Sequence, residues 1–250
     1  MGIYIKSENE ILRIKEAGRI VAMTLRYIED FLKPEVSLLE LETICDEFIR
    51  KHNGVSAFKG YRGFPSAVCI SLNEEVVHGI PDDRKLKIGD LVQIDVGVFK
   101  NGCYADGAKT FYIGNNIDPK IKKLLTITEE ALYLGIKAAK IGNRIGDISS
   151  AIQKHVEKHG FSVVRELGGH GVGLFLHEEP IVPNFGKPKE GLDLQKGMTL
   201  AIEPMVNMGK PDVVTAKNNW TVITKDRLPS AHFEHTIAIT ETGAEILTKE

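Results

Sequence analysis

The chain has 250 residues, of which 42% are hydrophobic and 26% charged, and its formal net charge is −2. These values are typical of a soluble globular protein near the upper size for one domain, and the charge gives no electrostatic footprint for nucleic acid or an anionic membrane. The first residues lack an apolar signal segment, no apolar run is long enough to span a membrane, and three well-separated cysteines form no CxxC pair, so we expect a cytoplasmic protein.

Two helices are predicted at the start of the chain. Apolar residues spaced by three and four over 11–32 indicate one amphipathic helix, and a similar pattern indicates another over 38–52. Ser-x-x-Glu capping boxes at Ser7 and Ser37 mark their starts, and Asn53-Gly54 ends the second. Strand-like runs follow at 67–72, 91–99 and 103–113.

The second half repeats this order. Asp118-Pro119 opens a helix that continues to about Ala139, and another helix is expected over 145–159. Strands are expected at 161–166, 198–207, 220–224 and 232–240. A shift of 107 residues places Leu38 on Ile145, which suggests an ancient duplication. The alternative is that any two amphipathic helices look alike.

The interleaved helices and hairpins predict an α+β fold, with a curved antiparallel sheet covered by helices. No Pro/Gly/Ser-rich linker divides the chain, so residues 1–250 are expected to form one domain. Its pseudo-repeat halves would cover about 1–115 and 116–250.

Four acids and one histidine are candidate metal ligands: Asp95, Asp106, His170, Glu203 and Glu234. Asp95 and Glu203 each interrupt an apolar run, where an unpaired carboxylate would cost several kcal/mol, roughly, to bury. Buried acids are normally paired or coordinate metals. If all five converge, they form an oxygen-rich site for two cations.

Asp95 and Asp106 flank the hairpin turn predicted at Asn101-Gly102. A two-residue loop at that position places Asp95 opposite Ala108, with Asp106 two positions away on the same face; a loop at Lys100-Asn101 would pair the two acids directly. Both registers point the carboxylates the same way, which is unfavourable without a cation. The alternative is a solvated hairpin that carries two unrelated acids.

The other candidates lie in distinctive local contexts. Glycines flank His170 and allow close backbone approach, while His78 precedes Gly-Ile-Pro and suits a turn at a cleft. Glu203 is expected within a central strand, and Glu234 shares one strand face with His232.

Taken together, the motifs resemble those of the type I methionine aminopeptidases over essentially the whole chain. The matching segments are VVHGIP at 76–81, IDVGVFKNGCYAD at 94–106, GHGVG at 169–173, HEEP at 177–180, IEPMV at 202–206 and FEHTI at 233–237. This family has the pseudo-twofold "pita-bread" fold, so the resemblance implies that fold here.

The resemblance implies that Asp95, Asp106, His170, Glu203 and Glu234 bind two divalent ions. Asp106 and Glu234 would bridge the ions, Asp95 would bind one of them, and His170 with Glu203 would hold the other. Co, Mn, Fe(II), Zn and Ni all suit such a site, and the sequence does not choose among them.

The implied activity is removal of the initiator methionine from nascent proteins and peptides whose second residue is small. A hydroxide bridging the ions would attack the first peptide carbonyl, and Glu203 would transfer the proton. His177 and His78 would act as catalytic residues that contact the substrate. The methionine pocket is expected to contain Tyr61, Phe64, Cys69 and Trp220, with Phe58 and Leu176 nearby. We expect a monomer that acts on nascent N-termini, and ribosome contact is left open.

Two residues depart from the family pattern: Leu174 follows GHGVG where many relatives have Arg, and Phe58 replaces a Cys found in some members. The chain is also expected to lack the zinc-finger-like extension of longer type I members and the large insertion of type II enzymes.

Two other functions compete. One is a proline-specific aminopeptidase or creatinase-like enzyme of the same fold, and the other is a non-catalytic binding protein built on it.

Overall fold

The computed structural model describes residues 2–250, and its four α-helices begin where the sequence predicts. Ser7 and Ser37 form capping boxes, and the Asp118 side chain accepts hydrogen bonds from two backbone amides of the first turn that follows it. The helices are α1 (Glu8–Glu29), α2 (Leu38–Lys51), α3 (Pro119–Ala138) and α4 (Ile145–Lys158), and a 3₁₀ turn, η1, covers Tyr61–Gly63.

Within residues 2–250 the strands pair only in antiparallel fashion. They are β1 (Val55–Ser56), β2 (Cys69–Leu72), β3 (Glu75–Val77), β4 (Leu91–Lys100), β5 (Cys103–Tyr112), β6 (Ser162–Val163), β7 (Gly168–Gly171), β8 (Glu178–Pro183), β9 (Thr199–Ile202), β10 (Met205–Asn207), β11 (Val213–Thr215), β12 (Val222–Thr224), β13 (Ser230–His232), β14 (His235–Thr240) and β15 (Gly243–Ile246). The ladders form four sheets: β1-β4-β2 with β5 on β4, β13-β10-β6, β11-β12-β3 and β15-β14-β9-β7-β8.

The β4–β5 hairpin has the two-residue loop predicted at Asn101-Gly102. Both loop residues have positive φ, 51° and 80°, as a type I′ turn requires. Asp95 consequently lies opposite Ala108, and Asp106 lies opposite Gly97. The two acids therefore occupy one face of the hairpin.

Two strands predicted as continuous are in fact interrupted at the candidate ligands. The run 198–207 divides into β9 and β10 around Glu203-Pro204, so the prediction of Glu203 inside a central strand is wrong; Pro204 has no N–H for a ladder. The run 232–240 divides into β13 and β14 at Glu234, whose N–H instead donates to the Ala108 carbonyl, 2.9 Å away. Both interruptions turn a carboxylate out of its strand.

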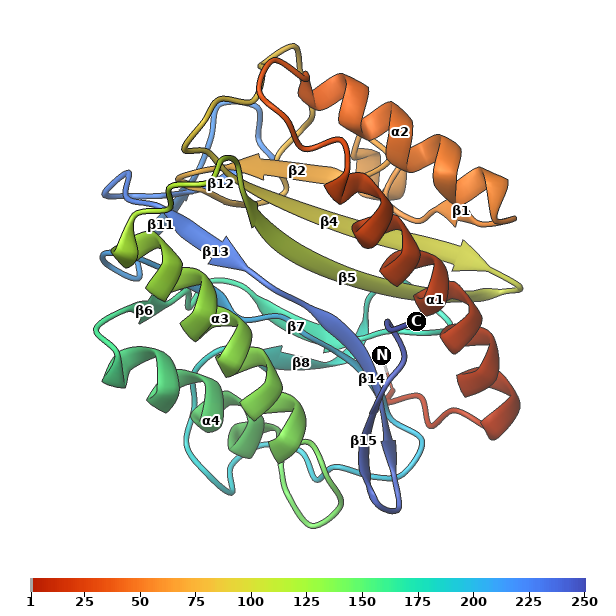
Figure 1. Cartoon of the computed structure of the whole chain (residues 1–250). Helices are drawn as coiled ribbons and strands as arrows, with labels where there is room; N and C mark the ends of the chain where they lie inside the picture. Colours follow the sequence, from red (N-terminus) through yellow and green to blue (C-terminus); the bar gives the residue numbers. More distant parts are fainter. Residues whose placement is uncertain (1) are drawn as a thin grey trace.

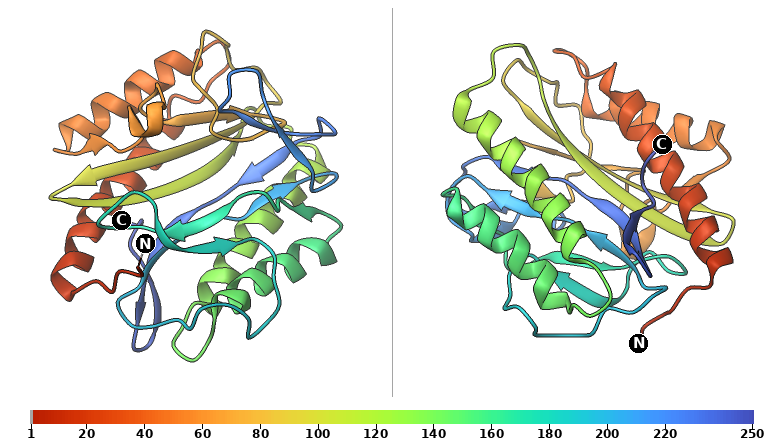
Figure 2. Two further views of the ribbon diagram at one scale, coloured as in Figure 1. Left: turned by 180° about the vertical axis from the view of Figure 1, so that it is seen from behind. Right: turned by 60° about the horizontal axis from the view of Figure 1, so that its bottom comes forward.

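The two halves contain corresponding elements in the same order. Helices α2 and α4 both have 14 residues, and their starts are 107 positions apart. The starts of the two-residue strands β1 and β6 are also 107 positions apart. Figure 1 shows α1 and α2 beside β2, β4 and β5, and α3 and α4 beside the strands of the second half. Seen from behind, the strands lie in front of the helices, which cover the opposite side (Figure 2).

Each half has its own apolar core, one around α1, α2 and the β4–β5 hairpin and the other around α3, α4, β9 and β14. No helix among residues 2–250 combines the length and apolar character that crossing a membrane requires. The strands missing from the sequence prediction are β1, β3, β7, β8, β11 and β15. All of them except β8 have two to four residues, so they carry little period-two signal, and the EEPIVP sequence of β8 contains two prolines, which argue against a strand.

Candidate metal centre and adjoining pocket

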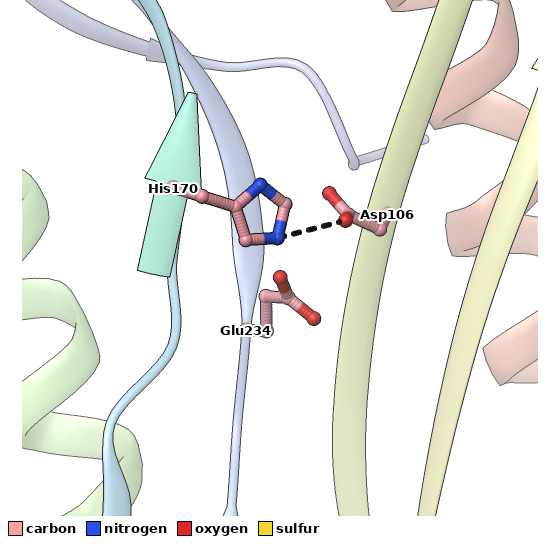
Figure 3. Close-up of side chains that lie close together, drawn as sticks. All are labelled: Asp106, His170 and Glu234. Carbon is pink, nitrogen blue, oxygen red and sulfur yellow. Dashed lines mark ion pairs between the residues drawn. The ribbon is translucent and has the colours of Figure 1, made fainter. Parts of the chain in front are cut away.

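Three candidate ligands from different parts of the chain meet between the halves. Asp106 comes from β5, His170 from β7 and Glu234 from the break between β13 and β14, and one ligand atom of each lies within 4.8 Å of the others. All three are buried, and Figure 3 shows their polar ends pointing toward one another. The His170 Nε2 and an Asp106 carboxylate oxygen are 3.5 Å apart.

Glu203 and Asp95 border this group of three. A carboxylate oxygen of Glu203, the residue that follows β9, lies 3.6 Å from the Nε2 of His170. Asp95 shares the hairpin face with Asp106, and its Oδ1 atom is buried without a hydrogen-bond partner. A buried carboxylate oxygen without a donor is the arrangement that a cation would satisfy.

The electrostatics of the site also favour cation binding. Burial is the largest cause that raises the pKa of Asp95, Asp106, Glu203 and Glu234, and the charges of neighbouring carboxylates add to it for all except Asp106. Removing carboxylates from water is unfavourable, and placing them side by side adds repulsion. Divalent cations would relieve both, so the residues present fit metal ions.

The tautomer of His170 suits metal binding. Its Nδ1 is 2.8 Å from the Gly171 carbonyl, which can only accept, so Nδ1 carries the proton. The Nε2 lone pair then faces Asp106. A hydrogen bond at the other nitrogen is the usual way in which a protein fixes a histidine ligand.

Two further residues lie against the acids, although their sequence contexts predicted no role for them. The Thr236 hydroxyl lies 3.0 Å from Asp106 Oδ1 and donates to the Asp106 carbonyl at 2.8 Å. His232 is buried, and its Nε2 lies 3.6 Å from Glu203 Oε2. The alternation of the sequence predicted that His232 shares a strand face with Glu234. Because the strand breaks at Glu234, His232 instead approaches Glu203.

Removing divalent metal with a chelator is expected to make stability fall as pH rises. Because the folded-state pKa values of these carboxyls are raised, the folded chain binds more protons than the unfolded chain above about pH 4. This contribution to the free energy of unfolding is fully present below the unfolded-state pKa values. It is lost as pH rises through the folded-state values.

Thermal unfolding in EDTA between about pH 4 and 8 measures this dependence. The Asp95→Asn variant is the comparison, because it removes one of the repelling carboxyls while keeping its shape. We expect a shallower fall for this variant than for the natural chain. Equal slopes for the two proteins would contradict the electrostatic account of the site.

His177 and His78 lie beside the acidic group, by which we mean the four acids Asp95, Asp106, Glu203 and Glu234 together with His170. The His177 ring centroid is 4.1 Å from that of His170 and 5.1 Å from that of Tyr61, on which it stacks at 16°. Burial is the main cause that lowers the pKa of His177 to about 3, and burial likewise lowers the pKa of His78. Both imidazoles are therefore neutral at pH 7 and can donate one hydrogen bond.

All six side chains expected around a methionine pocket belong to one apolar cluster. Its members are Ala57, Phe58, Phe64, Cys69 and Leu176, with Tyr61, Ile80, Tyr104 and Trp220 packed against them. The Phe64 and Trp220 rings meet edge to face, 5.2 Å apart. Cys69 pairs directly with Asp95 across β2 and β4, so the apolar wall adjoins the acids. Burial raises the pKa of Cys69 well above its usual range, which argues against a nucleophilic thiolate.

The two departures from the family pattern are accommodated by packing. Leu174 packs against the core of the first half. Phe58 lies over Gly97, and a Cβ atom at residue 97 would lie 2.4 Å from Phe58 Cε1. The large residue at 58 is therefore matched to the absence of a side chain at 97.

The Gly97→Ala variant is consequently expected to lose about 1–3 kcal/mol in the free energy of unfolding, the usual cost of overpacking a core. Urea denaturation of this variant and of Gly97→Ala/Phe58→Leu measures the coupling, with Phe58→Leu alone as the control. The added methyl group should cost much less when residue 58 is leucine. An equal cost in both backgrounds would show that the two positions are independent.

The chain is similar to known metallopeptidases over nearly its whole length. The model of metallopeptidase family M24 matches residues 13–241. "Methionine aminopeptidase 1" of Bacillus subtilis (strain 168) is 52% identical over 247 residues, covering 99% of each chain, and "Methionine aminopeptidase" of Escherichia coli (strain K12) is 49% identical over 252 residues, covering 99% of this chain and 94% of that one.

Solved structures distinguish the family from its fold neighbours. The methionine aminopeptidase from Rickettsia prowazekii superposes with a TM-score of 0.97 at 42% identity, covering 99% of this chain and 100% of that one. The Xaa-Pro dipeptidase from Bacillus anthracis has a TM-score of 0.79 at 24% identity, covers 98% of this chain but 62% of its own, and shares the fold alone. The chain therefore belongs to metallopeptidase family M24 and, within it, to the methionine aminopeptidases.

Proposed function

We propose that this chain removes the N-terminal methionine from nascent proteins and peptides, preferentially before a small second residue, and that it uses two divalent ions. The observation that carries the proposal is the contact between the acidic group and an apolar, aromatic-lined cluster. Cys69 lies opposite Asp95, and Tyr61 stacks on His177, which in turn adjoins His170. A flexible thioether side chain suits such a wall, because sulfur makes favourable contacts with aromatic rings.

The donor set supports two ions. Four ionised carboxylates carry a charge of −4, which two divalent cations balance, whereas one cation would leave two buried charges uncompensated. Asp95, Asp106, His170, Glu203 and Glu234 would hold them. When bound, such ions polarise a carbonyl and lower the pKa of water.

The surrounding residues have separable roles in this proposal. His177 donates a hydrogen bond to the carbonyl oxygen of the first peptide bond, where negative charge develops. His78 donates to the nitrogen of that bond as the bond breaks and this nitrogen gains a free lone pair. The backbone of His78 has a positive φ of 57°. The Thr221 hydroxyl donates to the His78 carbonyl, which holds His78 beside Trp220 and Thr221. Glu203, whose pKa is raised by burial, accepts a proton from the attacking water and passes it on to the leaving nitrogen.

Release of free amino acid from short peptides tests the proposal. We expect Met-Ala-Ser to be cleaved, Met-Leu-Ser to be cleaved more slowly, and Ala-Pro peptides not to be cleaved, with activity rising as Mn(II) or Co(II) is titrated into chelated protein. Preferential turnover of Ala-Pro peptides would instead favour a proline-specific enzyme. No turnover at saturating metal would favour a binding protein of the same fold.

A further inference from the structure

One buried ion pair has no part in the chemistry proposed above. Lys6, before α1, pairs with Glu178 of the HEEP segment, and the exposed fractions of the two side chains are 1% and 0%. An ion pair that is removed from water gains little net stability, because desolvation offsets the attraction. The hydrogen bonds of Glu178 indicate that the ion pair has a role other than stabilising the fold.

Glu178 closes the turn that precedes His177. Its Oε1 atom accepts hydrogen bonds from the backbone N–H groups of Leu174, at 2.7 Å, and Phe175, at 2.9 Å. Gly173 adds a hydrogen bond from its N–H to the Phe175 carbonyl, at 3.0 Å. One carboxylate therefore organises the segment 173–177 through two adjacent amides.

Lys6 anchors the other oxygen of this carboxylate. The Lys6 N–H donates to the Gly197 carbonyl at 2.8 Å, and its ammonium group donates to the Tyr4 carbonyl at 3.1 Å as well as to Glu178. Its aliphatic chain packs against Gly173, where a Cβ atom would lie 2.9 Å from Lys6 Cε. The segment before α1 thus holds the turn through both charge and packing.

We infer that Glu178, with Lys6 as its counter-ion, is a positioning residue for His177. The pair fixes the turn 173–177 so that the His177 imidazole stacks on Tyr61 and lies beside His170. Charge-assisted hydrogen bonds to backbone amides are stronger than neutral ones, which suits a turn that must hold one side chain in place. This inference rests on the proposed role of His177.

The variants Glu178→Gln and Lys6→Met test the inference. Glutamine keeps an acceptor of the same shape but loses the charge, and methionine keeps the length of the lysine chain. Each is expected to lower kcat for Met-Ala-Ser by about 10–100-fold, because misplacing a reacting group by about 1 Å costs up to about 100-fold. We expect KM to change less than kcat, and bound metal, measured by elemental analysis, to stay unchanged.

The distinguishing measurement repeats both substitutions in a His177→Ala background. There the turn no longer presents an imidazole, so neither substitution should lower kcat further. Lys187→Met is the matched control, because this lysine is exposed and forms a surface ion pair with Glu190. If burying a single charge prevents folding, the Lys6→Met/Glu178→Gln double variant replaces the single ones, with the same expectation.

An unchanged kcat in the Glu178→Gln and Lys6→Met variants would overturn the inference. So would an equal fall in kcat with and without His177, since that would show a general structural effect. A full kcat in His177→Ala alone is a different outcome: it would remove His177 from the proposed function and the basis of the inference with it.

Discussion

The Asp106→Asn variant is expected to lose at least about 100-fold in kcat/KM for methionine release and to bind less divalent metal. Asparagine preserves the shape of the side chain but not its charge, and Asp106 is the acid that approaches both His170 and Glu234. Removing a residue that only supports a metal ligand commonly costs 10–100-fold, roughly, so the loss of a central ligand should exceed this range.

Elemental analysis of protein prepared without added metal, followed by assays across a metal titration, measures both effects. Asp193→Asn is the control, because this acid is exposed and pairs with Arg144 at the surface. Asp106→Asn should remain impaired even at high metal concentration. Undiminished metal content together with full activity would refute the assignment of Asp106 as a ligand.

The sequence predicts the parts of the fold that local rules determine. Capping residues at Ser7, Ser37 and Asp118 mark three helix starts correctly, and Asn101-Gly102 sets the hairpin loop to two residues. That loop fixes the register in which both hairpin acids lie on one face of β4 and β5. Two of the five candidate ligands are therefore placed by a two-residue turn signal.

Of the strand breaks at the other two acids, only the one at Glu203 has a local signal, the proline that follows it. The apolar runs around Glu203 and Glu234 look continuous, because alternation reports which face is buried and not which neighbour a strand pairs with. At Glu234 the chain leaves β10 and bonds to β5 before joining β9. Such a change of partner depends on tertiary packing.

The long-range contacts of the pocket were accessible only through family resemblance. Phe64 and Trp220 are far apart in the chain, and periodicity carries no information about such a pair. The Lys6–Glu178 ion pair was predicted neither by periodicity nor by the resemblance. Sequence motifs drew attention to HEEP through His177. The contribution of the following glutamate becomes visible only when its hydrogen bonds to Leu174 and Phe175 are present.

Replacing His177 by alanine is expected to lower kcat by about 100–1000-fold while leaving bound metal unchanged, the range found when one donor to a developing oxyanion is removed. His177 adjoins His170 but stacks on Tyr61, so its loss leaves the acids and the His170 tautomer intact. Its pKa of about 3 keeps the ring neutral, and the activity of the natural chain should therefore show no titration of this residue near neutral pH.

Steady-state kinetics with Met-Ala-Ser, together with metal analysis, separate this expectation from that for Asp106→Asn: one variant keeps its metal and the other does not. His155→Ala provides the control, since His155 contacts Glu130 on the outer side of α4 and α3. A loss of metal in His177→Ala would make this residue part of the metal centre itself. Retention of both metal and kcat would instead leave stabilisation of the carbonyl oxygen to another donor, for which neutral His78 is a candidate.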